Sequence, residues 1–323
     1  MLDCDFEDCQ KPAVRNYGEC ALCDRHLCSK HLETEFHKCL KWEICHREAD
    51  QREVNALLKR VDVNALISHA SRLRNGLSCF IDLLPYDKST RNSVMGGMNY
   101  HIKIQFEDGI SWLARIRRSN ATSPPPDLRD SIIRSEIATL RLKTGLPVPK
   151  VYGFDFARKG NPVGVGYMLI EKLPRKALHW SLASAEQRKK VMDQLADIFI
   201  NLEQFPFELM GSLDQVETLQ LGPFARESLT DYSNTGMRPI GPLSSLEDYL
   251  RASIQLVIDL IMRDECYTQQ PIDACLIHKF LLDSVPKILS YYHLDDGHFY
   301  LKHADDKGEI MFSWMTTTIS LES

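Results

Sequence analysis

The sequence predicts an α+β fold in which a small metal-binding segment precedes a β-rich segment and then a helical one. The first 45 residues concentrate cysteine and histidine, residues 94–117 alternate apolar with polar side chains, and the second half repeats apolar residues at helical spacing. The chain has 323 residues, of which 44% are hydrophobic and 26% charged, so it is long enough for two domains and a substantial core.

Charge and hydropathy argue against several classes of protein. The formal net charge of −5 argues against a general polyanion binder, whose affinity depends on clustered lysine and arginine. The first residues contain neither the basic nor the apolar region of a secretory signal. No apolar run approaches the roughly 20 residues that a membrane span requires. The sequence therefore predicts a cytoplasmic protein, with the nucleus as the alternative, and no membrane partner.

Eight cysteine and histidine residues near the N-terminus form four close pairs. They are Cys4 and Cys9, Cys20 and Cys23, Cys28 and His31, and His37 and Cys39. Zinc prefers four tetrahedral thiolate or imidazole ligands, and short spacers allow two ligands to reach one ion. A segment this small buries too little apolar surface to fold alone, so bound metal would supply its folding free energy. The alternatives are a cysteine-rich tail without metal and a disulfide knot, which the lack of an export signal disfavours.

The order and spacing of these eight residues resemble those of the AN1-type zinc finger. The resemblance implies a cross-brace with two structural zinc ions. In that pattern one ion is held by Cys4, Cys9, Cys28 and His31, and the other by Cys20, Cys23, His37 and Cys39. His26, Cys45 and His46 fall outside the pattern. Sites closed by four protein ligands are structural and not catalytic, and the resemblance implies a module that binds a protein partner.

Apolar spacing and turn residues predict the elements of the first half. Helices are expected at residues 42–62, 63–74 and 128 to about 145, and short strands at 150–154 and 166–171. Asp108-Gly109 separates two β-rich runs, which is a strong signal for a hairpin. Asp127 follows a proline-rich break and is placed to cap the next helix.

The second half is predicted to be mainly helical. Helices are expected at residues 185–202, 245–263 and 273–292, and Ser244 with Glu247 forms a capping box for the second. Residues 213–243 are rich in Gly, Ser, Thr and Pro without periodicity and are predicted to form a long surface loop. The patterns divide the chain into a zinc finger at 1–45, a helical linker at 46–74, a β-rich small lobe at 75–175 and a helical large lobe at 176–323.

A β-rich small lobe followed by a helical large lobe is the layout of protein kinase-like enzymes. Gly96 and Gly97 precede a strand, where glycine lets backbone N–H groups approach a phosphate; the alternative is a plain turn. Arg115 lies on the following strand. Glu136 lies on the apolar face of the next helix, where an unpaired carboxylate would be costly. We therefore expect Arg115 and Glu136 to form an ion pair, the alternative being a Glu136 at the edge of the apolar face.

Asp305 stands in a His-x-Asp sequence, where it could accept the proton of an attacking hydroxyl; the alternative is a polar turn. Together these residues resemble the aminoglycoside phosphotransferase/choline kinase-like family, especially its fungal branch. The resemblance rests on Trp112-Leu113-Ala114-Arg115-Ile116-Arg117, Ile170-Glu171-Lys172-Leu173-Pro174 and Lys302-His303-Ala304-Asp305-Asp306-Lys307-Gly308. It implies transfer of phosphate from ATP to a small-molecule hydroxyl, with magnesium as a further cofactor. It also implies that Arg115 contacts phosphate, Glu136 is its helix partner and Asp305 is the base.

Two departures from the family pattern bear on catalysis. No aspartate follows Asp306, where the family has a magnesium ligand, and the final helices of the large lobe are missing. The sequence therefore predicts a C-terminally truncated domain whose transfer activity is impaired. The alternative is a non-catalytic zinc-finger interaction protein with a pseudokinase-like body. A nucleic-acid binder is the weakest interpretation, because acidic residues offset the basic ones in the finger.

Overall fold

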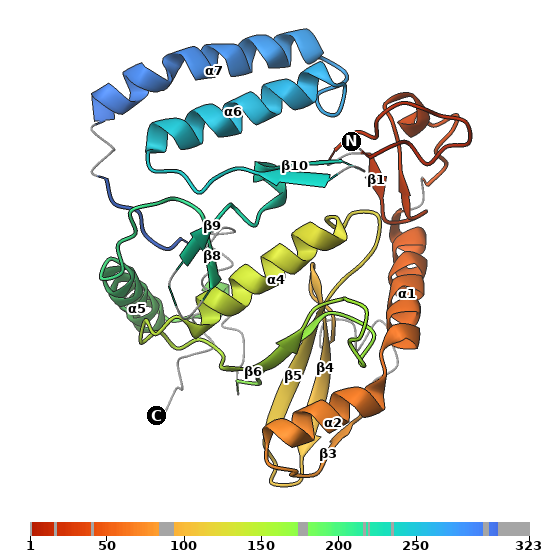
Figure 1. Ribbon diagram of the computed structural model, residues 1–323, viewed down its shortest axis with the longest axis vertical. Helices are drawn as coiled ribbons and strands as arrows, with labels where there is room; N and C mark the ends of the chain where they lie inside the picture. Colours follow the sequence, from red (N-terminus) through yellow and green to blue (C-terminus); the bar gives the residue numbers. More distant parts are fainter. Residues whose placement is uncertain are drawn as a thin grey trace.

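The computed structural model describes residues 2–15, 18–39, 42–83, 94–173, 180–215, 218, 220–233, 236–292 and 297–302. The fold is mixed α+β, as predicted (Figure 1). The N-terminal segment carries the short strands β1 (Glu19–Cys20) and β2 (Arg25–His26) and the 3-10 helix η1 (Lys30–Leu32). The rest of the described chain is built around one larger sheet and its helices.

Five strands form an antiparallel sheet in the order β3-β4-β5-β7-β6. They are β3 (Cys79–Ile81), β4 (Asn99–Phe106), β5 (Ser111–Arg117), β6 (Val151–Asp155) and β7 (Tyr167–Glu171). The predicted hairpin at Asp108-Gly109 is confirmed, because Gln105 pairs with Ser111 across it. Gly109 has a φ of 84°, a left-handed conformation that glycine adopts without steric cost.

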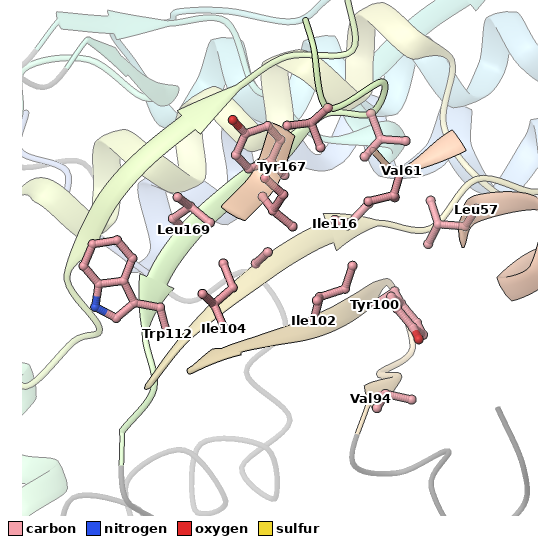
Figure 2. Packing of buried hydrophobic residues seen from close by; sticks show 14 of the residues in the cluster. Leu57, Val61, Val94, Tyr100, Ile102, Ile104, Trp112, Ile116, Tyr167 and Leu169 are labelled. Atoms are coloured by element: carbon pink, nitrogen blue, oxygen red, sulfur yellow. The ribbon is translucent and has the colours of Figure 1, made fainter. Parts of the chain in front are cut away.

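Helices cover both faces of this sheet. α1 (Trp42–Arg60) and α2 (Val63–Leu73) pack on one face, where Leu57 and Leu66 join Ile104 and Trp112 in the largest core (Figure 2). Side chains alternate along a strand, so Leu113 lies on the opposite face, where α4 (Pro126–Arg141) packs. The segment predicted to link two domains is therefore also part of the core.

Two helix caps differ from the sequence prediction. α4 begins at Pro126, and Asp127 makes no cap hydrogen bond because it lies inside the first turn. Proline suits that position, since its missing N–H would have no helical partner. α6 (Leu246–Met262) is capped by Ser245, whose hydroxyl accepts from the Asp248 N–H at 3.0 Å, and not by Ser244. The prediction was therefore one residue out of register for α6 and two residues late for α4.

The second half contains more strand than predicted. The helices α5 (Ala185–Leu202), α6 and α7 (Pro271–Tyr292) lie close to their predicted positions. The prediction of one long loop was wrong, because that segment forms two hairpins with a short helix between them. The hairpins are β8 (Ser212–Gln215) with β9 (Gln220–Gly222), and β10 (Thr230–Ser233) with β11 (Gly236–Pro239). The short helix between them is the 3-10 helix η3 (Glu227–Leu229), and another 3-10 helix, η2 (Trp180–Leu182), precedes α5. Strands of three or four residues are too short to show a clear alternation.

α6 and α7 pack against each other at one end of the molecule (Figure 1). Ile261, Cys266 and Ala274 form their small shared core. α7 is the outer helix of the pair and leaves large apolar side chains exposed, among them Phe280 at 71% and Tyr291 at 77%. Within the described ranges, no helix is both long and apolar enough to cross a membrane.

Candidate functional sites: two metal centres and an ion pair on the sheet

The eight predicted ligands gather into two groups of four. Cys4, Cys9, Cys28 and His31 form one group, and Cys20, Cys23, His37 and Cys39 form the other. Within each group every candidate ligand atom lies within 4.8 Å of the others. The first close pair therefore meets the third, and the second meets the fourth, which is the cross-brace arrangement.

Ring packing fixes the imidazole of the first cluster. Phe6 stacks on His31 with ring centroids 4.0 Å apart, and Phe36 contacts the same imidazole edge-on at 5.0 Å. His31 lies in η1, and its Nδ1 faces the sulfur atoms of Cys4 and Cys28. The rings of Phe6 and Phe36 therefore hold the His31 imidazole in place, and Phe6 also contributes to the small core of the N-terminal segment.

The distances in the first cluster fit a tetrahedral zinc ion. Zinc–sulfur and zinc–nitrogen bonds of about 2.3 and 2.0 Å separate a sulfur from a nitrogen by about 3.5 Å and two sulfurs by about 3.8 Å. The His31 Nδ1 lies 3.3 Å from the Cys4 Sγ and 3.5 Å from the Cys28 Sγ. The Sγ atoms of Cys9 and Cys28 are 3.9 Å apart. In the second cluster the Cys23 Sγ is 3.7 Å from the His37 Nε2.

Burial and neighbouring thiols raise the pKa values of one cysteine in each cluster. Burial raises the pKa of the Cys4 thiol to about 11 and, with the neighbouring Cys20, that of the Cys23 thiol to about 12. Both groups are therefore protonated at neutral pH, and a divalent cation would displace their protons as it binds the thiolates. Two sets of three cysteines and one histidine are typical of structural zinc sites.

The loops beside the ligands have special backbone geometry. Asp8, which precedes Cys9, and Asp24, which follows Cys23, have φ values of 59° and 56°. Aspartate tolerates this left-handed conformation better than most residues do. Gly18 is required for a different reason, since a Cβ there would overlap the carbonyl oxygens of Leu27 and Val14. The chain can therefore turn sharply enough for the close pairs to converge.

The predicted ion pair between Arg115 and Glu136 is confirmed. A guanidinium nitrogen of Arg115, on β5, contacts a carboxylate oxygen of Glu136, on α4. Both residues lie on the sheet face that α4 covers, and about a quarter of each side chain is exposed. A partly buried pair of this kind fixes the helix relative to the strand and leaves part of the guanidinium accessible to another anion.

Two further basic residues, His101 and Arg117, lie near this pair. Burial, with the charge of Arg115, lowers the pKa of His101 to about 4, so that this imidazole is neutral at neutral pH. Burial also lowers the pKa of Arg117, which lies two residues along β5 on the same face. The nearby guanidinium of Arg115 contributes to the lowered pKa of Arg117, whereas Glu136 and Glu227 oppose it. Acidic groups therefore offset part of the positive charge at this end of β5.

The structure gives less support to the other predicted site residues, Gly96, Gly97 and Asp305. The Gly96 N–H donates to the Asn99 carbonyl at 2.8 Å, and the Gly97 carbonyl accepts from Arg118 at 3.4 Å. The Gly96 N–H is therefore engaged within the protein and not directed at a ligand. Asp305, the predicted base, lies outside the described residues.

Sequence reasoning missed a second group of charged residues that join the N-terminal segment to the second half. The side chain of Arg15 donates to Glu265 Oε2 at 2.7 Å and to the Tyr232 carbonyl at 2.7 Å. Glu265 has 1% of its surface exposed. One signal was available, because Glu265 lies three residues after a largely apolar helix and directly precedes an apolar cysteine, but its partner is 250 residues away.

Comparison with known proteins points first to a class of small metal-binding domain. No family model matches the chain. The chain is 35% identical over 54 residues to AN1-type zinc finger protein TMC1 of Saccharomyces cerevisiae, a match that covers 17% of this chain and 36% of that protein. It is 37% identical over 95 residues to Altered inheritance of mitochondria protein 9, mitochondrial, of Komagataella phaffii, covering 26% of this chain and 16% of that protein. The matches thus span well under half of either relative. The likeness to the AN1-type protein and the two Cys/His clusters together support zinc binding by the N-terminal finger.

Proposed function

We propose that residues 2–39 form an AN1-type cross-brace finger that holds two structural zinc ions. The observation that carries this proposal is the convergence of eight cysteine and histidine side chains into two groups of four. Each group supplies three thiolates and one imidazole, and together they leave no coordination position for water or substrate. The ions would therefore stabilise the finger and would not take part in chemistry.

The zinc content of the purified protein tests this proposal. We expect elemental analysis to give two zinc ions per chain, and X-ray absorption to show about three sulfurs and one nitrogen around each. Cys28→Ser should reduce the content, because a two-cysteine, one-histidine set holds zinc less tightly. Cys275→Ser, which lies outside both clusters, is the matched control and should retain two ions. One ion or none in the unchanged protein would contradict the cross-brace.

We further propose that the sheet and α4 form the small lobe of a kinase-like, nucleotide-binding body. The arginine–glutamate pair is the observation that favours it, since kinases pair a basic residue on their third strand with a glutamate on the next helix. β5 is the third strand of this sheet in chain order, and α4 follows it directly. Arg115 would contact the ATP phosphates, with Gly97 nearby and Arg117 adding positive charge.

ATP binding measured by calorimetry, with and without magnesium, tests the kinase-like proposal. Arg115→Gln should weaken binding roughly tenfold or more, because a charge-assisted hydrogen bond to phosphate is lost. Glu136→Gln should have a smaller effect in the same direction. Arg158→Gln removes an exposed arginine from the β6–β7 connection and should bind like the unchanged protein. No ATP binding under either condition would contradict the assignment.

Turnover then separates an enzyme from a non-catalytic binding protein. The resemblance to phosphotransferases implies transfer to a small-molecule hydroxyl, with Asp305 as base and magnesium on the phosphates. The assay follows ADP release with aminoglycoside, choline and homoserine acceptors, and uses Asp305→Asn as its control. Turnover lost in that variant supports the enzyme, whereas ATP binding without turnover supports an interaction protein with a pseudokinase-like body.

A further inference from the structure

The finger contacts two parts of the molecule that lie far apart in the sequence (Figure 1). On the side of the second cluster, the Leu22 carbonyl accepts from Arg52 of α1, and Asp24 accepts from the Ala121 N–H at 2.6 Å. On the other side, Arg15 reaches β10 and the turn between α6 and α7. The finger therefore bridges the sheet and its helices to the α6–α7 pair.

Four side chains form the contact with the α6–α7 turn, and we call them the Arg15 network. They are Arg15, Asp231, Arg263 and Glu265. Glu265 accepts from Arg15 on one oxygen and from Arg263 on the other, each at 2.7 Å. Asp231 also contacts both arginines, at 3.3 Å and 2.7 Å. Arg238 adds a third, exposed cation 3.6 Å from Asp231, whereas Arg15 and Glu265 are almost fully buried.

Backbone contacts reinforce the network. The Arg15 N–H donates to the Glu265 carbonyl at 2.7 Å, and the Arg15 guanidinium donates to the Thr230 and Tyr232 carbonyls. The guanidinium also lies 4.0 Å from the centre of the Tyr232 ring. Burial alone would raise the pKa of Asp231, but its hydrogen bond and charge contacts with the arginines hold that pKa below its usual value. The carboxylate is therefore ionised at neutral pH.

The first metal cluster positions Arg15. The Val14 N–H donates to the Leu27 carbonyl at 3.0 Å, and the Leu27 N–H donates to the Gly18 carbonyl at 2.8 Å. Leu27 directly precedes Cys28, a member of that cluster, and both are about 98% buried. The backbone on either side of Arg15 is thus hydrogen-bonded to Leu27, which lies between β2 and the metal ligand Cys28.

We propose that the finger acts within its own chain as a zinc-dependent brace, in which the zinc-loaded first cluster holds Arg15 in place and Arg15 holds β10 and the α6–α7 turn. The α6–α7 pair has only a small core of its own and packs mainly on itself. Loss of zinc frees Arg15, removes the hydrogen bonds that Arg15 makes to Glu265 and to the β10 carbonyls, and releases the turn. The inference rests on the proposed two-zinc finger.

Hydrogen–deuterium exchange of the full chain, read by mass spectrometry, tests the brace. Arg15→Met removes the cation but no metal ligand, and should keep two zinc ions. Exchange of residues 230–233 and 263–270 should rise at least about tenfold, as expected when a buried pair loses one partner. Arg25→Gln changes an exposed arginine of the same finger and is the matched control. A high-affinity zinc chelator should produce the same change in the unchanged protein.

Zinc content and exchange together separate the two proposals. If the purified protein holds no zinc, the proposed finger fails. If it holds two ions but Arg15→Met exchanges like the unchanged protein at residues 263–270, the brace is overturned and the finger stands. The brace is also overturned if chelation raises exchange in β4 and β5 as much as in the turn, since zinc would then support the whole fold. Protection of β4 and β5 alongside release of the turn supports the brace.

Discussion

Removing zinc should unfold residues 2–39 while the five-stranded sheet stays folded. The finger has a small core, in which Leu27 and Cys28 are the most deeply buried members, so metal must supply much of its stability. Apparent zinc-binding free energies for such domains are about 10–16 kcal/mol at neutral pH, which is larger than the roughly 2–5 kcal/mol typical of a core truncation. The sheet has its own core, including Ile104 and Leu169, which are fully buried.

Chelation followed by two-dimensional NMR checks this expectation. The amide signals of the finger should collapse to the narrow range of an unfolded chain, and those of β4, β5 and β7 should keep their dispersion. Adding zinc back should restore the finger signals. A finger whose spectrum survives complete removal of the metal would contradict the expectation and would favour a disulfide-linked or purely apolar fold.

Leu169→Ala should lower the free energy of unfolding of the sheet by about 2–5 kcal/mol. Leu169 lies at the centre of β7, is fully buried and belongs to the largest core, where surrounding side chains are held by two helices (Figure 2). Truncation therefore leaves a cavity that cannot easily close. Thermal unfolding should show a midpoint roughly 5–15 °C lower.

Leu182→Ala is the matched control for this substitution. Leu182 has 82% of its surface exposed, so its truncation should change the midpoint little. Equal effects of the two substitutions would show that Leu169 does not occupy a packed core.

Local patterns predicted most of the regular structure and the metal ligands. The spacing of the cysteines and histidines indicates four close pairs, and the resemblance to the AN1-type finger implied which pairs share an ion. Helix α5 was predicted with its observed bounds, because its apolar repeat is long; in the structure Ser184 caps it. The Arg115–Glu136 pair could also be predicted, since an acidic residue on an apolar helix face requires a partner.

The missed features have weak local signals or depend on contacts between distant residues. The hairpins between Ser212 and Pro239 are stabilised by pairing, and their short strands have little propensity of their own. Arg15 is one of several basic residues in the finger, and its sequence neighbours do not indicate that it becomes buried. Ser245 is the cap in place of Ser244, because two adjacent serines give the helix two possible N-cap residues.

The Arg15 network also sets an order of assembly during synthesis. Arg15 and Glu265 are separated by 250 residues, so at about 5–20 residues per second the finger emerges roughly 10–50 seconds before its partner is made. A zinc ion can bind the finger in that interval. The Arg15 guanidinium stays solvated by water until Glu265 has been synthesised. The α6–α7 pair therefore packs against an already folded finger when it leaves the ribosome. In zinc-starved cells the finger would still be unfolded at that point.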